Sequence, residues 1–176
     1  TPNVNGYYQR YNNGMKAGND MVMKLLRGEI PARHILKNGK TWFIDTLDVV
    51  SHSMGFAYSM GMIKALQEYI HVGRVYALAP ENAGTGTVPD GIDEFWQYGC
   101  KEYSLPGGYP MNKQDGIAAQ CPVRNLDKYN PLKTGGRVFI PETYTMGFLD
   151  SHKIVNYEWI FTYLINPQVG GYVKKR

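Results

Sequence analysis

The sequence lacks several features that would assign it to a class at once. Nowhere do about 20 consecutive apolar residues occur, the length that a transmembrane helix needs. The only two cysteines, Cys100 and Cys121, fit neither a zinc site nor a disulfide-rich framework, and whether they are bridged stays open. The N-terminus shows no initiator Met and no secretion signal, so we expect a processed product or a fragment and leave the compartment undetermined.

Charge of one sign is also scarce. The net charge is only +4, and the one dense basic cluster, residues 174–176, is typical of a solvated tail. A nucleic-acid-binding protein would concentrate Lys and Arg along one face, so we expect no nucleic-acid partner. No cluster of His, Asp and Glu has the spacing of metal ligands, so we predict neither a metal nor a cofactor.

The composition that remains, with 43% apolar residues in 176, is that of one globular domain spanning residues 1–176. We expect loops or tails at residues 1–14 and 166–176, and a helix at about 19–27. Asn38-Gly39 is a strong hairpin signal between short strands at 33–36 and 41–44.

Apolar periodicity then changes repeatedly along the chain. The patterns predict, in order, a strand at 45–51, a helix at 56–70, a strand at 72–79, weaker strands at 94–100 and 137–140, and a last helix at 154–164. Strand–helix–strand units of this length favour a mostly parallel sheet flanked by helices, and hence the α/β class. The long loops at 80–93 and 101–136 would lie near the carboxyl edge of that sheet, where ligands bind in this class.

The strongest local pattern is the segment 51–55, Ser-His-Ser-Met-Gly, between the strand and the helix. Such a strand–turn–helix is the form of a nucleophile elbow, with Ser53 as the nucleophile and small residues, Ser51 and Gly55, on either side. The backbone N–H of Met54, at the helix start, would bind an oxyanion. The alternative is that Ser53 is a helix N-cap. The second Ser-Met-Gly triplet falls inside the helix, where small residues at 59 and 61 would permit close helix–sheet packing.

A serine nucleophile needs a base and an acid, which follow it in the order Asp or Glu, then His, in α/β-hydrolases. His34 precedes Ser53, the His52 side chain would diverge from its neighbour, and His71 lies beyond the far end of the predicted helix. His152 remains as the base. Asp115, in an Asp-Gly turn after the strand at 94–100, is the preferred acid, with Asp150 and Asp127 as alternatives.

Residues 51–55, Asp115-Gly116-Ile117 and His152 resemble, in order and spacing, the bacterial lipases and esterases of the α/β-hydrolase superfamily over residues 45–165. The apolar strand ending in Ala79-Pro80 is similar to that family's strand after the elbow helix. The resemblance implies hydrolysis of a carboxylic ester or lipid through an acyl-serine intermediate. A lipase-like domain of a large secreted or toxin-like bacterial protein is one version of it.

The family's earlier strands, and the His-Gly loop that gives a second oxyanion donor, have no counterpart in this sequence. Residues 5–8 would be the tail of such a loop, and the sheet would be incomplete on its N-terminal side unless a partner chain or another segment covers that edge. The alternative function is therefore a non-catalytic interaction module or remnant on a hydrolase fold. The sequence identifies no substrate-binding residue, acyl length or oligomeric state.

Overall fold

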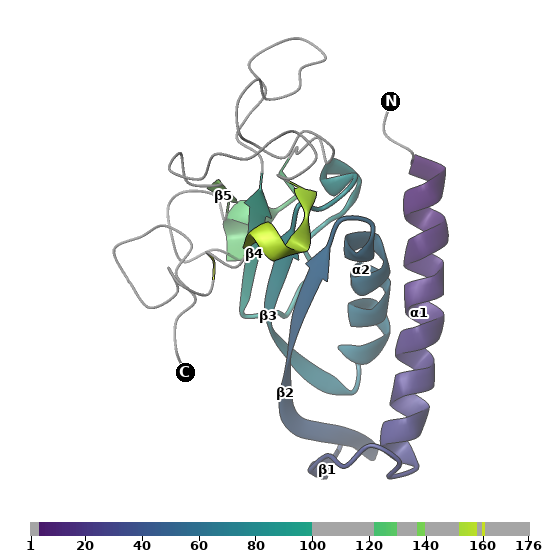
Figure 1. Cartoon of the computed structure of the whole chain (residues 1–176). Helices are drawn as coiled ribbons and strands as arrows, with labels where there is room; N and C mark the ends of the chain where they lie inside the picture. The colour runs from purple at the N-terminus through teal and green to yellow at the C-terminus, as the bar shows by residue number, and fades with distance from the viewer. Residues whose placement is uncertain (1–3, 100–121, 130–136, 140–151, 158–159, 161–176) are drawn as a thin grey trace, which may run out of the picture.

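The structure is a computed structural model of the whole chain, and it describes residues 4–99, 122–129, 137–139, 152–157 and 160 (Figure 1). The helices and strands, in chain order, are α1 (Val4–Leu26), β1 (His34–Lys37), β2 (Lys40–His52), α2 (Gly55–Leu66), β3 (Ile70–Leu78), η1 (Ala83–Thr85), β4 (Glu94–Gly99), η2 (Leu126–Tyr129), β5 (Arg137–Phe139) and η4 (Ile154–Tyr157). Cys100, Cys121 and the segment 166–176 lie outside the described residues.

The strands form one five-stranded sheet in the order β1-β2-β3-β4-β5. Strands β2 to β5 are parallel to their neighbours, whereas β1 pairs antiparallel with β2, so the sheet is mixed. This arrangement confirms the predicted α/β class. The carboxyl ends of the parallel strands meet at one edge, beside which η4 lies in Figure 1.

The predicted hairpin is confirmed. Asn38 and Gly39 both have positive φ, at 52° and 75°, which matches a two-residue turn of the type that Asn-Gly favours. The strands expected on either side of residue 44 are one continuous strand, β2, of 13 residues. Helix α2 is shorter than the predicted helix at 56–70, because it ends at Leu66 and Ile70 is the first residue of β3.

The prediction of a loop over residues 1–14 is wrong for residues 4–14, which belong to α1. Its buried residues follow helical spacing along the whole element: Tyr7, Gly14, Gly18, Val22 and Leu25. Asn and Gly are weak helix formers, so local propensity argues against this helix. Tertiary packing of one face overrides that propensity.

The packing partner of α1 is α2, which lies between α1 and the sheet in Figure 1. A Cβ atom at Gly14 would overlap the Tyr58 carbonyl, and one at Gly61 would overlap the Tyr11 carbonyl. Gly61 therefore serves helix–helix rather than helix–sheet contact, which corrects the expectation for that position. Ser59 donates to the Gly55 carbonyl at 2.8 Å within α2.

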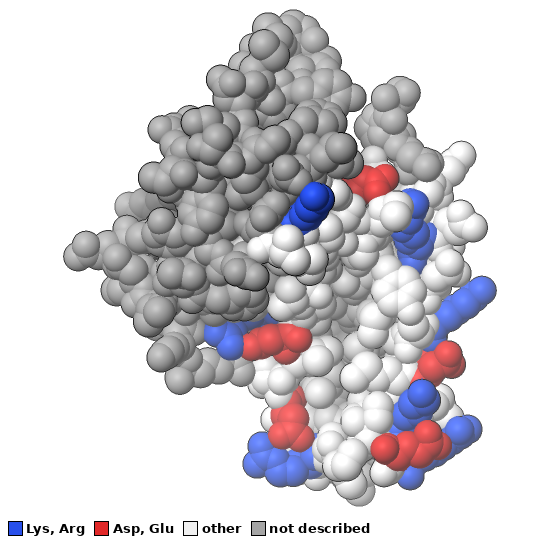
Figure 2. Space-filling model, in the orientation of Figure 1, with Lys and Arg blue, Asp and Glu red and all other residues white. Residues whose placement is uncertain are grey.

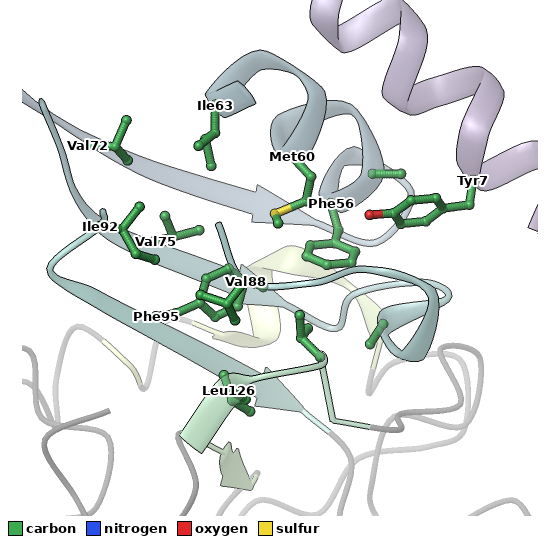
Figure 3. Packing of buried hydrophobic residues seen from close by; sticks show 14 residues of the cluster. Tyr7, Phe56, Met60, Ile63, Val72, Val75, Val88, Ile92, Phe95 and Leu126 are labelled. Carbon is green, nitrogen blue, oxygen red and sulfur yellow. The ribbon is translucent and has the colours of Figure 1, made fainter. Parts of the chain in front are cut away.

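Between α2 and the sheet lies the main hydrophobic core (Figure 3). Phe56 and Ile63 of α2, Val75 of β3 and Phe95 of β4 are fully buried there. The Tyr7 ring of α1 reaches the same core and lies 6.1 Å from the Phe56 ring. Phe56 is the second residue of α2, so the core fixes the start of this helix against the ends of the strands.

The outer edge of β2 is only partly covered. β1 pairs with residues 40–43 of β2, and no other strand of the described chain pairs with β2 on that side. Val50 there is 57% exposed. An additional strand completing this edge, as the sequence suggested, stays a prediction.

The described surface in Figure 2 carries Lys and Arg interspersed with Asp and Glu, without an extended patch of one sign on that face. Two exposed ion pairs tie the strands laterally: Arg33 to Asp45, and Arg74 to Asp48. No helix within the described ranges combines the length and apolar character that a bilayer crossing requires.

Candidate active site at the end of β2

Ser53 occupies a backbone conformation that residues other than glycine rarely adopt. It follows the last residue of β2 directly, has a φ of 52°, and stands two residues before the start of α2. The left-handed region costs a non-glycine residue about 1–2 kcal/mol. Such strain persists only where the surrounding structure determines it, and it concentrates at functional sites.

Three backbone hydrogen bonds hold Ser53 in this conformation. Its N–H donates to the Leu78 carbonyl at 3.0 Å, and its carbonyl accepts from the N–H groups of Phe56 and Glu81, both at 3.1 Å. The partners lie on the end of β3, in α2 and in the loop after β3. The turn is therefore fixed from both sides, and its side chain projects from a rigid base.

The Ser53 hydroxyl meets the imidazole of His152. The distance from Ser53 Oγ to His152 Nε2 is 2.8 Å, and the pair is partly buried. His152 lies between β5 and η4, so the pair joins residues 99 positions apart in the chain. The structure thus brings together the two residues that the sequence assigned as nucleophile and base; their catalytic roles remain predictions.

Two of the remaining histidines lie elsewhere. His71, at the start of β3, pairs with Asp93 at 2.9 Å, and the ring of His34 packs edge-on against Phe43 at 6.0 Å. The start of β3 is the opposite end of the sheet from Ser53.

His52 differs from the expectation that its side chain diverges from the site. Its Nε2 lies 2.7 Å from the His152 backbone carbonyl oxygen, and the centroids of the two rings are 5.0 Å apart. Residues 52 and 53 therefore both contact His152, through different atoms. The expectation failed because a strand residue and a turn residue are not related by the alternation of a regular strand.

The predicted acid Asp115 lies outside the described residues, as does the alternative Asp150. The other alternative, Asp127, is described: it is exposed in the first turn of η2. Within the part of the chain that the structure describes, no hydrogen bond joins the Asp127 carboxylate to His152. The assignment of the acid to Asp115 remains a prediction.

The N-terminus of α2 offers the candidate oxyanion donor. Met54 directly precedes this 12-residue helix. Among the described residues, its N–H donates to no backbone carbonyl, so it is available at the positive end of the helix dipole. The expected second donor loop at residues 5–8 is not a loop but the first turns of α1. From α1, the Arg10 guanidinium contacts the Met54 sulfur at 2.7 Å, which places a positive charge beside the elbow.

The small residues flanking Ser53 have different surroundings. Ser51 is 6% exposed, and its Oγ is buried and has no hydrogen-bond partner among the described residues. A Cβ at Gly55, in contrast, would meet no atom of the described residues within 4 Å. Among these residues, no close contact therefore requires the small residue at position 55.

Comparison with protein-family models, curated proteins and solved structures finds no match to this chain. The assignment of the site therefore depends on its own geometry. Among the described residues, no three His, Cys, Asp or Glu side chains gather as they would around a metal ion.

A separate cavity of about 350 Å³ lies between α1 and the segment after β3, lined by Tyr7, Tyr11, Lys64 and Arg124 among others. Burial raises the pKa of Tyr7 to about 12, so its hydroxyl stays neutral at physiological pH. Neither Ser53 nor His152 lines this cavity.

Two contacts of the site are not predicted by the sequence analysis. The contact of His52 with His152 is one of them, and the adjacency of His52 to Ser53 is the sequence signal that could have indicated it. The Glu81 N–H that supports the Ser53 carbonyl is a backbone group, and no residue type marks such a donor in a sequence.

Proposed function

We propose that this protein is a serine hydrolase that cleaves carboxylic esters, with Ser53 as nucleophile and His152 as general base. The observation that carries the proposal is the 2.8 Å contact between Ser53 Oγ and His152 Nε2, made by a serine in the left-handed region at a strand–helix turn. An ordinary helix N-cap has extended backbone angles and needs no imidazole at its hydroxyl. The serine of a nucleophile elbow, in contrast, lies on a strained turn and needs a base beside its hydroxyl.

The proposed reaction proceeds by acyl transfer. Ser53 Oγ attacks the ester carbonyl carbon while His152 Nε2 takes the hydroxyl proton, and the tetrahedral oxyanion lies against the Met54 N–H. The intermediate collapses, and the leaving alcohol receives the proton from His152. Water then attacks the acyl-serine, with His152 again accepting and returning a proton. Asp115 would orient the imidazole through its other ring nitrogen.

Exposed apolar side chains beside the pair support an ester with an apolar acyl or alcohol group. Met54 is 47% exposed next to Ser53, and Ile154 and Val155 are 54% and 62% exposed just after His152. Small-molecule sites are lined mostly by apolar side chains with a few polar groups, and these three side chains would supply apolar contact for a substrate. They favour a lipid-like or short-chain ester over a highly charged substrate.

The test is hydrolysis of p-nitrophenyl esters from acetate to decanoate by the wild type, Ser53→Ala and Ser59→Ala. Ser59 is a matched control, because it lies in α2 and its hydroxyl is bonded to the Gly55 carbonyl. We expect Ser53→Ala to lower kcat/KM by about 10³-fold or more and Ser59→Ala to leave it unchanged. A folded wild type without hydrolysis above the Ser53→Ala background would contradict the proposal and favour the non-catalytic interaction module.

A further inference from the structure

Two consecutive residues of the elbow contact one distant residue through two different atoms. Ser53 Oγ lies 2.8 Å from the His152 ring, and His52 Nε2 lies 2.7 Å from the His152 carbonyl oxygen. The His52 ring also packs against the His152 ring, with 42° between their planes, and edge-on against Tyr157 at 6.2 Å. His52 is therefore placed between the end of β2 and the segment that carries His152.

The second contact has only one chemical direction. A carbonyl oxygen accepts hydrogen bonds and donates none, so the hydrogen must be on His52 Nε2. His152 Nε2, in contrast, must be free of hydrogen to accept the Ser53 proton. The Nε2 atom thus has opposite roles in the two imidazoles: it donates in His52 and accepts in His152, which is the ring that contacts the Ser53 hydroxyl.

We propose that His52 is a positioning residue, which holds the backbone of residue 152 so that its imidazole reaches Ser53. This inference rests on the proposed hydrolase function. The contact at the His152 carbonyl and the contact at its ring nitrogen together restrict the position and the tilt of the imidazole.

The position of His152 needs such an anchor because it arrives from far along the chain. It is 100 residues from His52, and the nearest deeply buried side chain after it in the described chain is Tyr157. Residues 153–155 between them are exposed. A displacement of about 1 Å of a catalytic group can cost on the order of 100-fold in rate.

The test separates the hydrogen bond from simple ring packing. His52→Gln keeps an N–H donor near the position of Nε2, whereas His52→Phe keeps the ring and removes the donor; His52→Leu serves if the Phe variant does not fold. At matched thermal stability, we expect Phe or Leu to lower kcat by about 10- to 100-fold with KM nearly unchanged, and Gln to recover most of kcat. Equal kcat in the wild type and the Phe variant, or no recovery with Gln, would overturn the inference.

A readout without turnover distinguishes failure of this inference from failure of the proposed function. In ¹⁵N-histidine NMR spectra, Ser53→Ala should shift the His152 Nε2 resonance in the wild-type and His52→Gln backgrounds but not in His52→Phe. If the shift follows this pattern and no ester is hydrolysed, the positioning role stands and the hydrolase proposal fails. If the shift persists in His52→Phe, the positioning role is wrong whatever the activity.

Discussion

The two ends of strand β2 make an instructive pair. Asn38 lies two residues before the first residue of β2, and Ser53 directly follows its last residue. Both have a φ of 52°. At the hairpin end the conformation falls on Asn-Gly, residues that tolerate it with little strain. At the other end it falls on a serine, for which the same angle is costly.

The two ends also differ in the reach of their contacts. Near the hairpin end, Arg33 pairs with Asp45, 12 residues away, and the Phe43 N–H donates to the Tyr69 carbonyl at 2.8 Å. The Ser53 end is held by the loop after β3 and by His152, 99 residues away. Strain at a hydroxyl that contacts a distant imidazole is the feature of the Ser53 end that supports the proposed active site.

The largest effect should be the loss of activity on removal of the His152 imidazole at the Ser53 end of β2. We expect His152→Ala to lower kcat for ester hydrolysis by about 10²- to 10⁴-fold, because the serine loses its base. The matched control is His71→Ala, which removes a histidine paired with Asp93 at the opposite end of the sheet. Comparable losses in both variants would show that the effect is not specific to the Ser53 end.

The next effect concerns the helix pair that supports both ends. Gly61→Ala would force a methyl group into the Tyr11 carbonyl of α1, and we expect it to lower the free energy of unfolding by about 2–3 kcal/mol. Gly55→Ala, where the methyl group meets no atom of the described residues within 4 Å, is the control and should not destabilise the fold. Urea denaturation measures both, and similar values would refute the close α1–α2 contact.

A smaller effect is expected from substitutions at the two residues with a φ of 52°, Ser53 and Asn38. Ser53→Gly should be more stable than Ser53→Ala by about 1 kcal/mol, because glycine adopts a positive φ without strain and both variants lack the hydroxyl. The Asn38→Gly variant should likewise be more stable than the Asn38→Ala variant by a similar amount. If Ala equals Gly at residue 53 while they differ at residue 38, Ser53 is not strained in solution.

The smallest effect belongs to the hairpin end and depends on pH. Hydrogen bonds from Arg33 hold the pKa of Asp45 below its ordinary value. The contribution to stability is therefore present above that ordinary value and is lost as the pH falls through the lower, folded-state pKa. Asp45→Asn and Arg33→Gln should each flatten this acid-side loss in denaturation curves, by the same small amount. An unchanged acid-side slope in either variant would exclude the pair as its cause.

The features that the sequence predicted correctly are those with a local pattern, and the features that it missed depend on contacts between distant residues. Strands with strong local patterns were predicted to within a few residues, and Asn38-Gly39 marked its own turn. Helix α1 was predicted only from about residue 19 onward, and its part at residues 4–18 was missed, because Gly14 and Gly61 permit two helices to touch and no local propensity records such a contact. The proximity of Ser53 and His152 was reached only through chain order and a family resemblance, since no local pattern encodes a contact over 99 residues. The contact of His52 with the His152 carbonyl could not be predicted, because it depends on the direction in which the His52 side chain points.

The most direct test is covalent labelling of the intact protein with a fluorophosphonate, followed by peptide mass spectrometry. If Ser53 is an activated nucleophile, one adduct forms on the peptide containing Ser53, forms much more slowly in His152→Ala, and is absent in Ser53→Ala. A folded wild type that stays unlabelled, or that is labelled only at another residue, would contradict the central claim.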